Sequence, residues 1–394
     1  MSAGPIRIAY VTSHPIQYQA PLFRRLAATD GVALKVFFAS DMGLSTYVDP
    51  GFAREVKWDV PLIEGYEHEF VKNVSPKPGV QRFFGLLNPA MPMRVLAWKP
   101  DAVIVHGYAH ATEHLVMAAC RAAGVPVLLR GESNLLAQRP RFTRLAKLLG
   151  AAALKQVLSG ALAIGTLSRE YFRHYGIPEE RIFVAPYSVD NDFFFARADA
   201  AEARAAAWKA ELGIPAEALV VGFAAKLSAV KDCKTLIEAF GRAAVPGSAL
   251  AIVGDGPLRQ ELESQAATYP GSCIKFAGFV NQSEMPAAYA LADLFALPSV
   301  FEPWGLAINE AMTLGRAVVV SDAVGCAPDL VSRDTGFVFP AGDAQSLAAI
   351  LTSALGDRER LRRMGAAGRE KIRGWGIPET AAGIVSAARA VARA

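Results

Sequence analysis

The sequence predicts an α/β protein that consists of two doubly wound domains with parallel sheets. Short, apolar, β-rich runs alternate with Ala- and Leu-rich helical segments almost from end to end, which is typical of βαβ units. The chain has 394 residues, enough to bury two hydrophobic cores. Because hydrophobic residues make up 52% of the chain and charged residues only 20%, a disordered chain is excluded.

The first half contains six short apolar runs of the kind found in strands that helices cover on both faces. These strands are expected at Ile6–Thr12, Leu34–Ala39, Ala102–His106, Val125–Arg130, Ala161–Leu167 and Arg181–Ala185. The helices between them are expected to begin near Ala20, Ala111, Arg141 and Ser168.

The alternation breaks at Val189–Arg197 and then starts afresh, so we place the interdomain linker at this break. The predicted domains are residues 1–190 and 191–377, and a last helix over residues 378–394 is expected to cross back to the first domain. In the second domain strands are expected at Leu219–Ala224, Ala249–Val253, Cys273–Phe276, Leu294–Leu297 and Ala317–Ser321, and helices at Cys233–Ala243, Pro257–Thr268, Gln282–Ala290, Leu306–Leu314 and from Asp343 onward. Doubly wound sheets bind ligands at the carboxyl ends of their strands, so we expect the two domains to face each other across a cleft there.

Composition and termini narrow the class of function. Lys and Arg exceed Asp and Glu by 41 − 37 = 4, too few to indicate a nucleic-acid partner. The four cysteines lie far apart, with no pair at metal-ligand or redox spacing, which indicates buried thiols in a reducing compartment. The first residues lead directly into a strand without a signal sequence, and the most apolar later stretch, residues 151–164, is shorter than the roughly 20 residues of a membrane span. We therefore expect a cytoplasmic protein.

The most informative segment is Pro298–Met312, PSVFEPWGLAINEAM, which follows an apolar strand and opens a helix. Gly305 lets the backbone approach a ligand closely, and free amides at the helix start, near Leu306 and Ala307, suit anionic phosphates. A diphosphate fits this position.

Two carboxylates in this segment, Glu302 and Glu310, could border one bound molecule, because the second lies about one helical turn past the helix start. A carboxylate accepts two hydroxyl hydrogen bonds in a fixed geometry, which suits sugar and ribose hydroxyls better than phosphate. The alternative is structural: Glu302 complements the helix dipole and Glu310 lies on a solvated face. Spacing alone leaves both interpretations open.

With four further stretches, this segment resembles the motifs of retaining GT-B glycosyltransferases of family 4, the glycosyl transferases group 1. Its two glutamates are similar to the family's paired-glutamate motif. The further stretches are similar, in the same order, to the phosphate-binding loop, a strand-to-helix turn, the base-contacting turn and the strand after the motif helix: Gly222–Lys231, Val253–Arg259, Gly278–Val280 and Gly315–Asp322. The resemblance covers essentially the whole second half. It implies the GT-B architecture, two Rossmann-like domains facing across a cleft, with the acceptor in the first and the donor in the second.

The resemblance also implies which residues hold a nucleotide diphosphate sugar. Glu302 would hold the sugar and Glu310 the ribose, while the remaining donor residues would be Lys226, Lys231, Gly254, Val280, Gly305, Leu306 and Ala307. Where the family has an arginine this chain has Lys226, which keeps the charge but loses the bidentate fork. The family breaks the bond to the diphosphate without a metal, using its cations, including Lys231 here, and the helix amides. Asp190-Asn-Asp192 has the form of a metal site in another glycosyltransferase architecture, but it falls in the expected linker, so we interpret it as a structural turn.

In the first half the resemblance is weaker. Where the family often carries a Gly-Gly pair, this chain has TSHPIQY at Thr12–Tyr18, as some members that build cell-surface polysaccharides do. His14, Gln17 and Tyr18 follow the carboxyl end of a strand and are acceptor-side candidates. The alternative for His14 is that it only caps a turn before Pro15.

Two other strand ends carry polar residues. His106 matches the family's histidine that contacts the reacting sugar, and His110 is the second choice. Histidine donates or accepts a proton near neutral pH, but a lone histidine at a strand end is often only hydrogen-bonded. Arg130 and Glu132 follow the next strand and serve either acceptor recognition or a buried ion pair that supports the loop.

Two basic, apolar stretches, residues 77–94 and 139–155, suit contact with anionic lipid headgroups, which a lipid-linked acceptor would make useful. The alternative is that they form helices packed on a sheet with solvated lysines and arginines.

The resemblance therefore predicts a retaining, metal-independent glycosyltransferase without a cofactor. It would move a sugar from a UDP- or GDP-sugar to a hydroxyl of a glycan, lipid-linked or small-molecule acceptor, in polysaccharide or glycoconjugate synthesis. The alternatives are a nucleotide-sugar epimerase on the same fold and a non-catalytic nucleotide-sugar sensor. Hydride transfer is disfavoured, because the turn at Gly254-Asp-Gly256 lacks the full dinucleotide fingerprint.

Overall fold

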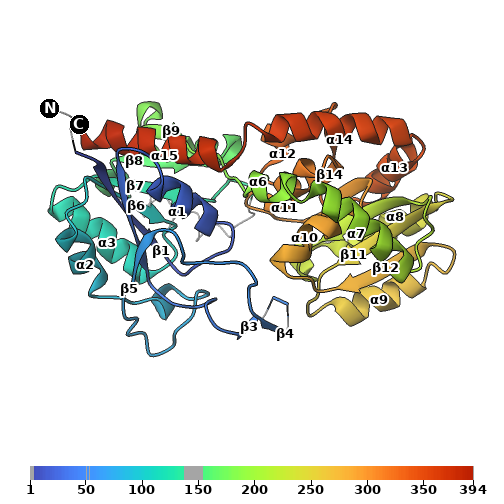
Figure 1. Cartoon of the computed structure of the whole chain (residues 1–394), viewed down its shortest axis with the longest axis horizontal. Helices are drawn as coiled ribbons and strands as arrows, with labels where there is room; N and C mark the ends of the chain where they lie inside the picture. The colour runs from blue at the N-terminus through green and yellow to red at the C-terminus, as the bar shows by residue number, and fades with distance from the viewer. Residues whose placement is uncertain (1–3, 50, 53, 137–153, 394) are drawn as a thin grey trace. The chain divides into compact units, whose positions relative to one another are not determined.

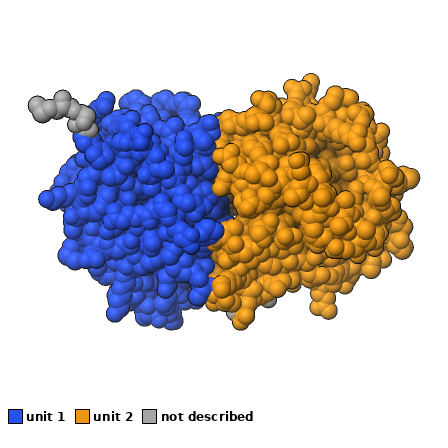
Figure 2. Space-filling model, viewed as in Figure 1, with its two compact units in different colours: residues 1–45, 61–187, 377–394 blue, residues 46–60, 188–376 orange. Residues whose placement is uncertain are grey.

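The computed structural model describes residues 4–49, 51–52, 54–136 and 154–393. Their contacts divide the chain into two compact units (Figure 2). Unit 1 comprises residues 1–45, 61–187 and 377–394, and unit 2 comprises residues 46–60 and 188–376. The C-terminal helix thus belongs to unit 1. The segment Thr46–Val60, which the sequence analysis assigns to the N-terminal domain, belongs to unit 2.

Unit 1 is built on a seven-stranded parallel sheet with the order β5-β2-β1-β6-β7-β8-β9 (Figure 1). Its strands are β1 (Ile6–Thr12), β2 (Val32–Phe38), β5 (Glu67–Phe70), β6 (Ala102–His106), β7 (Val127–Gly131), β8 (Gly160–Ala163) and β9 (Ile182–Val184). Apolar side chains of α1 (Ala20–Ala27) and α15 (Ile377–Ala392) pack on one face, and those of α2 (Met91–Ala97), α3 (Ala111–Ala122) and α5 (Thr166–His174) on the other. Helices on both faces bury the central strands along nearly their whole length.

Unit 2 is built on a six-stranded parallel sheet with the order β12-β11-β10-β13-β14-β15. Its strands are β10 (Leu219–Ala224), β11 (Ser248–Val253), β12 (Cys273–Gly278), β13 (Leu294–Leu297), β14 (Ala317–Ser321) and β15 (Gly336–Phe339). The main core lies under α8 (Cys233–Ala243), α9 (Arg259–Ala267), α13 (Ala344–Leu355) and α14 (Arg358–Ile372). The remaining helices are α6 (Asn191–Phe195), α7 (Ala198–Glu211), α10 (Met285–Ala290), α11 (Leu306–Thr313) and α12 (Ala327–Leu330).

Short elements complete the two units. In unit 2, β3 (Tyr47–Asp49) and β4 (Arg54–Val56) form a separate antiparallel pair. Single 3-10 turns lie at η1 (Phe83–Gly85), η2 (Glu179–Arg181), η3 (Ala229–Lys231) and η4 (Gln282–Glu284). Within the described part of the chain, no helix is both long and apolar enough to cross a bilayer.

The predicted fold class is confirmed, whereas several element boundaries differ. The expected strand at Ala161–Leu167 is wrong at its end, because β8 stops at Ala163 and α5 begins just after Gly165. Hydrophobicity alone does not separate the end of a buried strand from the start of a buried helix. The edge strand β5 was missed because its sequence, EHEF, is largely polar. The helix expected near Arg141 lies outside the described residues.

The strand orders decide which loops lie side by side. In unit 2, β12, β11, β10 and β13 are adjacent and parallel, so the loops after these four strands share one edge of the sheet. In unit 1, β1, β6 and β7 are adjacent and parallel in the same way. All predicted donor residues follow the four strands of unit 2.

Candidate active site

The two lysines predicted to bind phosphate lie in the loop between β10 and α8. Lys226 follows β10 by two residues, and Lys231 ends the 3-10 turn η3. The Lys231 ammonium forms an ion pair with the Glu302 carboxylate, in which Lys231 is 25% exposed and Glu302 14% exposed. Ser299 Oγ also lies 3.5 Å from Glu302 Oε2. The structure therefore brings the predicted sugar-binding carboxylate directly onto a predicted diphosphate-binding cation.

Gly305 adopts a backbone conformation that residues other than glycine rarely adopt. Its φ is 103°, and a Cβ at this position would lie 2.9 Å from Val324 Cγ1 and 3.0 Å from Leu297 Cδ2. Gly305 also precedes the first residue of α11, and no side chain caps this helix within the described residues. The first amides of α11, those of Leu306 and Ala307, are consequently open to an anionic ligand.

Glu310 lies on α11 and accepts a 2.5 Å hydrogen bond from the hydroxyl of Tyr289 on α10. Burial raises the pKa of Glu310 to about 7, although hydrogen bonds from Tyr289 and Gln282 act in the opposite direction. Glu310 is half-buried and its carboxylate is held by a tyrosine, so it does not lie on a fully solvated helix face. Sequence reasoning missed Tyr289, which is 21 residues away and lies on a different helix.

Hydrogen bonds tie the turns after β10, β11 and β12 together. The Gly254 amide donates to the Gly278 carbonyl over 2.8 Å, and the Leu227 amide donates to the Asp255 carbonyl over 2.9 Å. Gly254 has a φ of 134°, and a Cβ there would lie 2.0 Å from the Ala225 carbonyl oxygen, so only glycine lets these loops approach so closely. Val280 follows β12 by two residues at the same sheet edge.

A contact that the sequence did not suggest involves Lys226. Its ammonium lies 2.9 Å from both carboxylate oxygens of Asp49, at the end of β3. Both residues belong to unit 2, although they are 177 positions apart in the chain. No motif marks Asp49, so only the tertiary structure reveals this partner.

In unit 1, His106 is the centre of a polar network at the carboxyl ends of β1, β6 and β7. Its Nδ1 lies 2.8 Å from the Tyr10 hydroxyl, and its Nε2 lies 3.3 Å from both Glu132 Oε1 and the Gln19 amide nitrogen. An ionised Glu132 accepts but does not donate, which favours the tautomer with a proton on Nε2 and with Nδ1 accepting from Tyr10. Tyr10 and Gln19 were not predicted from the sequence.

Burial alone would raise the pKa of Glu132, but hydrogen bonds from His106 and Tyr187 and the charge of Arg130 hold it below its ordinary value. The Tyr187 hydroxyl donates to Glu132, and its ring packs edge-on against Tyr18 with the centroids 5.7 Å apart. Arg130 is buried, with its guanidinium 5.5 Å from the Tyr187 ring. The structure thus joins His106, which was predicted to contact the reacting sugar, with three of the predicted acceptor-side residues in one cluster: Tyr18, Arg130 and Glu132.

The other predicted residues of unit 1 lie in different surroundings. His110 is the N-cap of α3, where it exchanges hydrogen bonds with Glu113 in a capping box and contacts the Val80 carbonyl at 3.0 Å, so its contacts are structural. His14 has its Nδ1 2.9 Å from Ser13 Oγ, and burial, followed by the charge of His110, lowers its pKa to about 4. Gln17 is half-buried in the same loop.

The Asp-x-Asp sequence at the start of α6 makes a structural hydrogen bond. Asp190 Oδ1 accepts a 3.0 Å hydrogen bond from the Phe193 amide and so caps α6. Among the described residues, no three His, Cys, Asp or Glu side chains are grouped in a way that could hold a metal ion.

The basic stretch 77–94 exposes apolar side chains: Phe83 is 45% exposed, and Phe84 and Met93 are each 65% exposed. Most of the other basic stretch, 139–155, lies outside the described residues.

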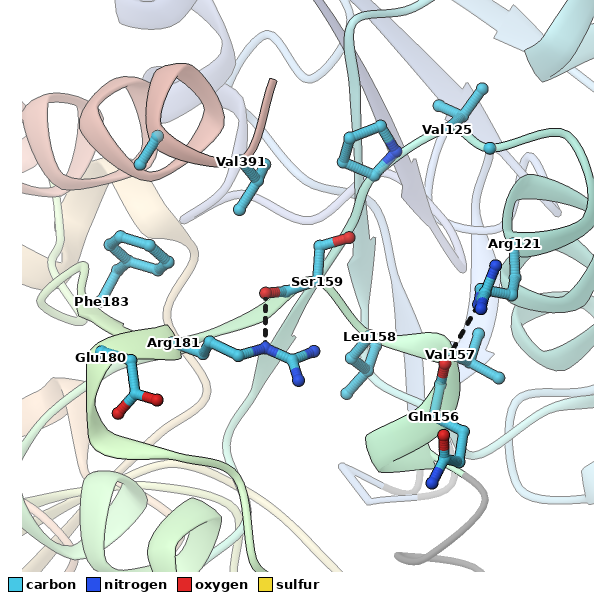
Figure 3. Close-up of a pocket in the computed structure, with 13 residues that line it drawn as sticks. Arg121, Val125, Gln156, Val157, Leu158, Ser159, Glu180, Arg181, Phe183 and Val391 are labelled. Atoms are coloured by element: carbon cyan, nitrogen blue, oxygen red, sulfur yellow. Dashed lines mark hydrogen bonds between the residues drawn. The ribbon is translucent and has the colours of Figure 1, made fainter. Parts of the chain in front are cut away.

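A pocket of about 540 Å³ lies elsewhere in unit 1, at the amino ends of β7, β8 and β9 (Figure 3). In it, the Arg181 Nε donates to the Ser159 carbonyl over 2.9 Å, and the Arg121 Nε donates to the Gln156 carbonyl over 3.2 Å. None of the predicted site residues lines this pocket. It lies at the end of the sheet opposite to the one where doubly wound folds bind ligands.

Comparisons with known proteins agree with this geometry. Residues 205–371 match the model of the family described as glycosyl transferases group 1. The chain is 30% identical to 2-deoxystreptamine N-acetyl-D-glucosaminyltransferase of Streptomyces fradiae over 72% of this chain and 69% of that protein. It is 37% identical to sulfoquinovosyl transferase SQD2 of Arabidopsis thaliana, over 32% of this chain and only 25% of that protein. The crystal structure of Anabaena Alr3699/HepE in complex with UDP superposes with a TM-score of 0.74 at 19% identity, covering 98% of this chain and 100% of that one.

The two parallel α/β units have the GT-B fold of the structural neighbour, and the family model and the 30% identical relative show that the chain is a glycosyltransferase. The chain belongs to the glycosyl transferases group 1 family.

Proposed function

We propose that this glycosyltransferase moves a sugar from a nucleoside diphosphate sugar to a hydroxyl acceptor with retention of the anomeric configuration. The observation that carries this proposal is the convergence in unit 2 of two lysines, two glutamates and an uncapped helix start at the ends of β10, β11, β12 and β13. The UDP in the structural neighbour supports a nucleoside diphosphate as the leaving group. A UDP- or GDP-sugar is the donor we expect.

Each donor residue has a distinct task in this proposal. Lys226, Lys231 and the first amides of α11 stabilise the negative charge that develops on the diphosphate as its bond to the sugar breaks. Glu302 accepts hydrogen bonds from sugar hydroxyls and keeps Lys231 oriented through their ion pair. Glu310 accepts from ribose hydroxyls, with Tyr289 holding its carboxylate in place. Because these groups supply the cationic charge, the reaction needs no metal or other cofactor.

The chemical step is a substitution at the anomeric carbon. The bond from this carbon to the diphosphate oxygen breaks, a bond to the acceptor oxygen forms on the same face, and the acceptor proton passes to the departing phosphate oxygen. No carboxylate is assigned as a nucleophile, because Glu302 is assigned to the sugar hydroxyls and Glu310 to the ribose hydroxyls, with Lys231 and Tyr289 holding them. We assign contact with the reacting sugar to His106, whose orientation Tyr10 and Glu132 determine.

Acceptor recognition is assigned to the polar cluster of unit 1. The cluster combines aromatic rings, a cation and a carboxylate, and these groups suit the faces and hydroxyls of a sugar or cyclitol. The exposed Phe83, Phe84 and Met93 would let unit 1 touch a membrane if the acceptor is lipid-linked.

A thermal-shift screen against UDP-, GDP- and ADP-sugars in EDTA tests the donor site. A ligand that binds only the native state stabilises it by roughly 2.7 kcal/mol at one hundred times its dissociation constant. We expect one donor to raise the melting temperature and Lys231→Ala and Glu310→Ala to abolish the shift. Lys234→Ala is the matched control, because Lys234 is an exposed lysine of the same unit paired with Glu261 on α9.

Product analysis then tests the reaction class. A new glycoside with the donor's anomeric configuration supports the proposal. An isomeric donor without transfer would indicate an epimerase, and binding without turnover towards any acceptor would indicate a sensor. A shift that requires a divalent metal would contradict the metal-independent mechanism.

A further inference from the structure

The segment Thr46–Val60, here called the arm, packs on the loops that carry the donor residues. It lies between two stretches of unit 1 in the sequence but belongs to unit 2. Strands β3 and β4 pair within the arm, with Tyr47 opposite Val56 and Asp49 opposite Arg54. The described residues of the arm therefore include a short antiparallel strand pair.

Asp49 forms the ion pair between the arm and the phosphate-binding loop. Its carboxylate accepts from the Lys226 ammonium through both oxygens, and from the amides of Gly51 and Phe52 over 2.8 and 3.2 Å. Asp49 is 7% exposed. Burial alone would raise its pKa, but the hydrogen bonds and charge of Lys226 and the two amides hold the pKa below its ordinary value. The buried Asp49 carboxylate therefore holds the Lys226 ammonium in an ion pair.

Aromatic contacts place the arm over the turn after β12. The Phe52 ring packs edge-on against Phe279 with the centroids 4.9 Å apart, and the Lys226 ammonium lies 4.7 Å from the Phe52 ring centre. The Arg54 guanidinium lies 4.7 Å from the Phe279 ring centre and 3.9 Å from Asp255. The arm thereby covers residues of three loops, those after β10, β11 and β12.

Two polar contacts hold the C-terminal part of the arm, at Lys57 and Asp59. The Asn281 side-chain amide donates to the Lys57 carbonyl over 2.6 Å, and the Ser283 hydroxyl donates to Asp59 over 2.5 Å. These contacts are exposed and do not involve Lys226 or Lys231.

Both lysines that would bind the diphosphate are paired with carboxylates in this structure, Lys226 with Asp49 and Lys231 with Glu302. A diphosphate and the Asp49 carboxylate would compete for the Lys226 ammonium, and their negative charges repel one another. Phe52 in the same way covers Phe279, in the turn that resembles the base-contacting turn of the family.

We propose that the arm is an autoinhibitory strap on the donor site, in which Asp49 occupies the phosphate position on Lys226 until a nucleoside diphosphate displaces it. This inference rests on the proposed donor site of unit 2. It assigns to the arm a regulatory role, which is to lower the affinity for nucleoside diphosphates by the fraction of molecules in which the strap is closed.

The variant Asp49→Asn tests the strap, because it keeps the shape of the side chain and removes the competing charge. We expect its Kd for UDP or GDP, measured by calorimetry, to fall by about fivefold or more relative to the wild type. The nucleotide then no longer has to displace a carboxylate from Lys226. Glu55→Gln is the matched control: Glu55 is an exposed residue of β4 in the same strand pair, and its substitution makes the same change of charge.

Three outcomes are distinguishable. A lower Kd for Asp49→Asn with an unchanged Kd for Glu55→Gln supports the strap. A wild type that binds a nucleoside diphosphate as well as or better than Asp49→Asn overturns the strap but leaves the proposed function intact. A wild type that binds no nucleoside diphosphate overturns both.

Hydrogen exchange of the wild type gives a second test that does not depend on any variant folding. Amides of residues 46–60 are expected to exchange faster when UDP or GDP is bound, because the strap has been released. Slower exchange of these amides on binding would show that the arm closes over the nucleotide, and would overturn the proposal.

Discussion

Replacing Gly305 by alanine is the sharpest test of the geometry around α11. The new side chain would meet two penalties. A left-handed backbone is disfavoured for residues other than glycine by roughly 1–2 kcal/mol, and φ at Gly305 is 103°. Overpacking a filled core costs roughly 1–3 kcal/mol more, and the Cβ would lie 2.9 Å from Val324 and 3.0 Å from Leu297. We expect Gly305→Ala to lower the free energy of unfolding of unit 2 by about 2–5 kcal/mol.

Gly342→Ala separates the two penalties. Gly342 also belongs to unit 2 and has a φ of 77°, but a Cβ there would meet nothing within 4 Å. It should therefore show the backbone penalty of roughly 1–2 kcal/mol alone. Urea unfolding read by tryptophan fluorescence compares the variants, because Trp304 stacks on Trp375 with the ring centroids 5.4 Å apart, next to Gly305 in the chain. Equal destabilisation by both substitutions would refute the steric argument.

Three further predictions follow from the site. Since the pKa of Glu310 is raised from 4.5 to about 7, the folded state binds more protons between these values, so the stability of unit 2 should fall as pH rises from 4.5 to 7, by at most about 3 kcal/mol. Glu310→Gln should abolish that fall in urea titrations at several pH values; a wild type whose stability does not fall over this pH range would contradict the burial of this carboxylate. Lys231→Met should lower kcat by about 10²–10³-fold in a transfer assay, as expected for losing one group that stabilises the leaving group, and a change in KM alone would remove Lys231 from the chemical step. Asp190→Ala should reduce the free energy of unfolding by about 1 kcal/mol through loss of the α6 cap, without creating or removing a metal requirement; loss of activity that added metal restores would revive the metal-site interpretation.

Local sequence predicted most of the elements that carry the donor site. The strand before the segment Pro298–Met312, and the glycine and the helix start within it, were all expected, because apolar periodicity and backbone freedom act over a few residues. Elements with a weak sequence pattern were not predicted. The polar edge strand β5 has no apolar alternation, and the arm has no motif at all.

Within the site, the partners of the predicted residues were missed more often than the residues themselves. Glu310 was singled out from the sequence, but Tyr289, which holds it, was not. The same is true of His106 with Tyr10 and Gln19. Each partner is a tyrosine or glutamine whose surroundings, not its type or spacing, give it a role.

The sequence by itself determined the α/β class, the family, and the backbone at Gly305, because these depend on periodicity, ordered motifs and the conformational freedom of single residues. Only the tertiary structure decided which charges meet. Asp49 and Lys226 are 177 positions apart, and they pair because the arm folds onto the loop after β10. Such pairings depend on strand order and on the packing of distant segments, and no local pattern in the chain encodes either of them.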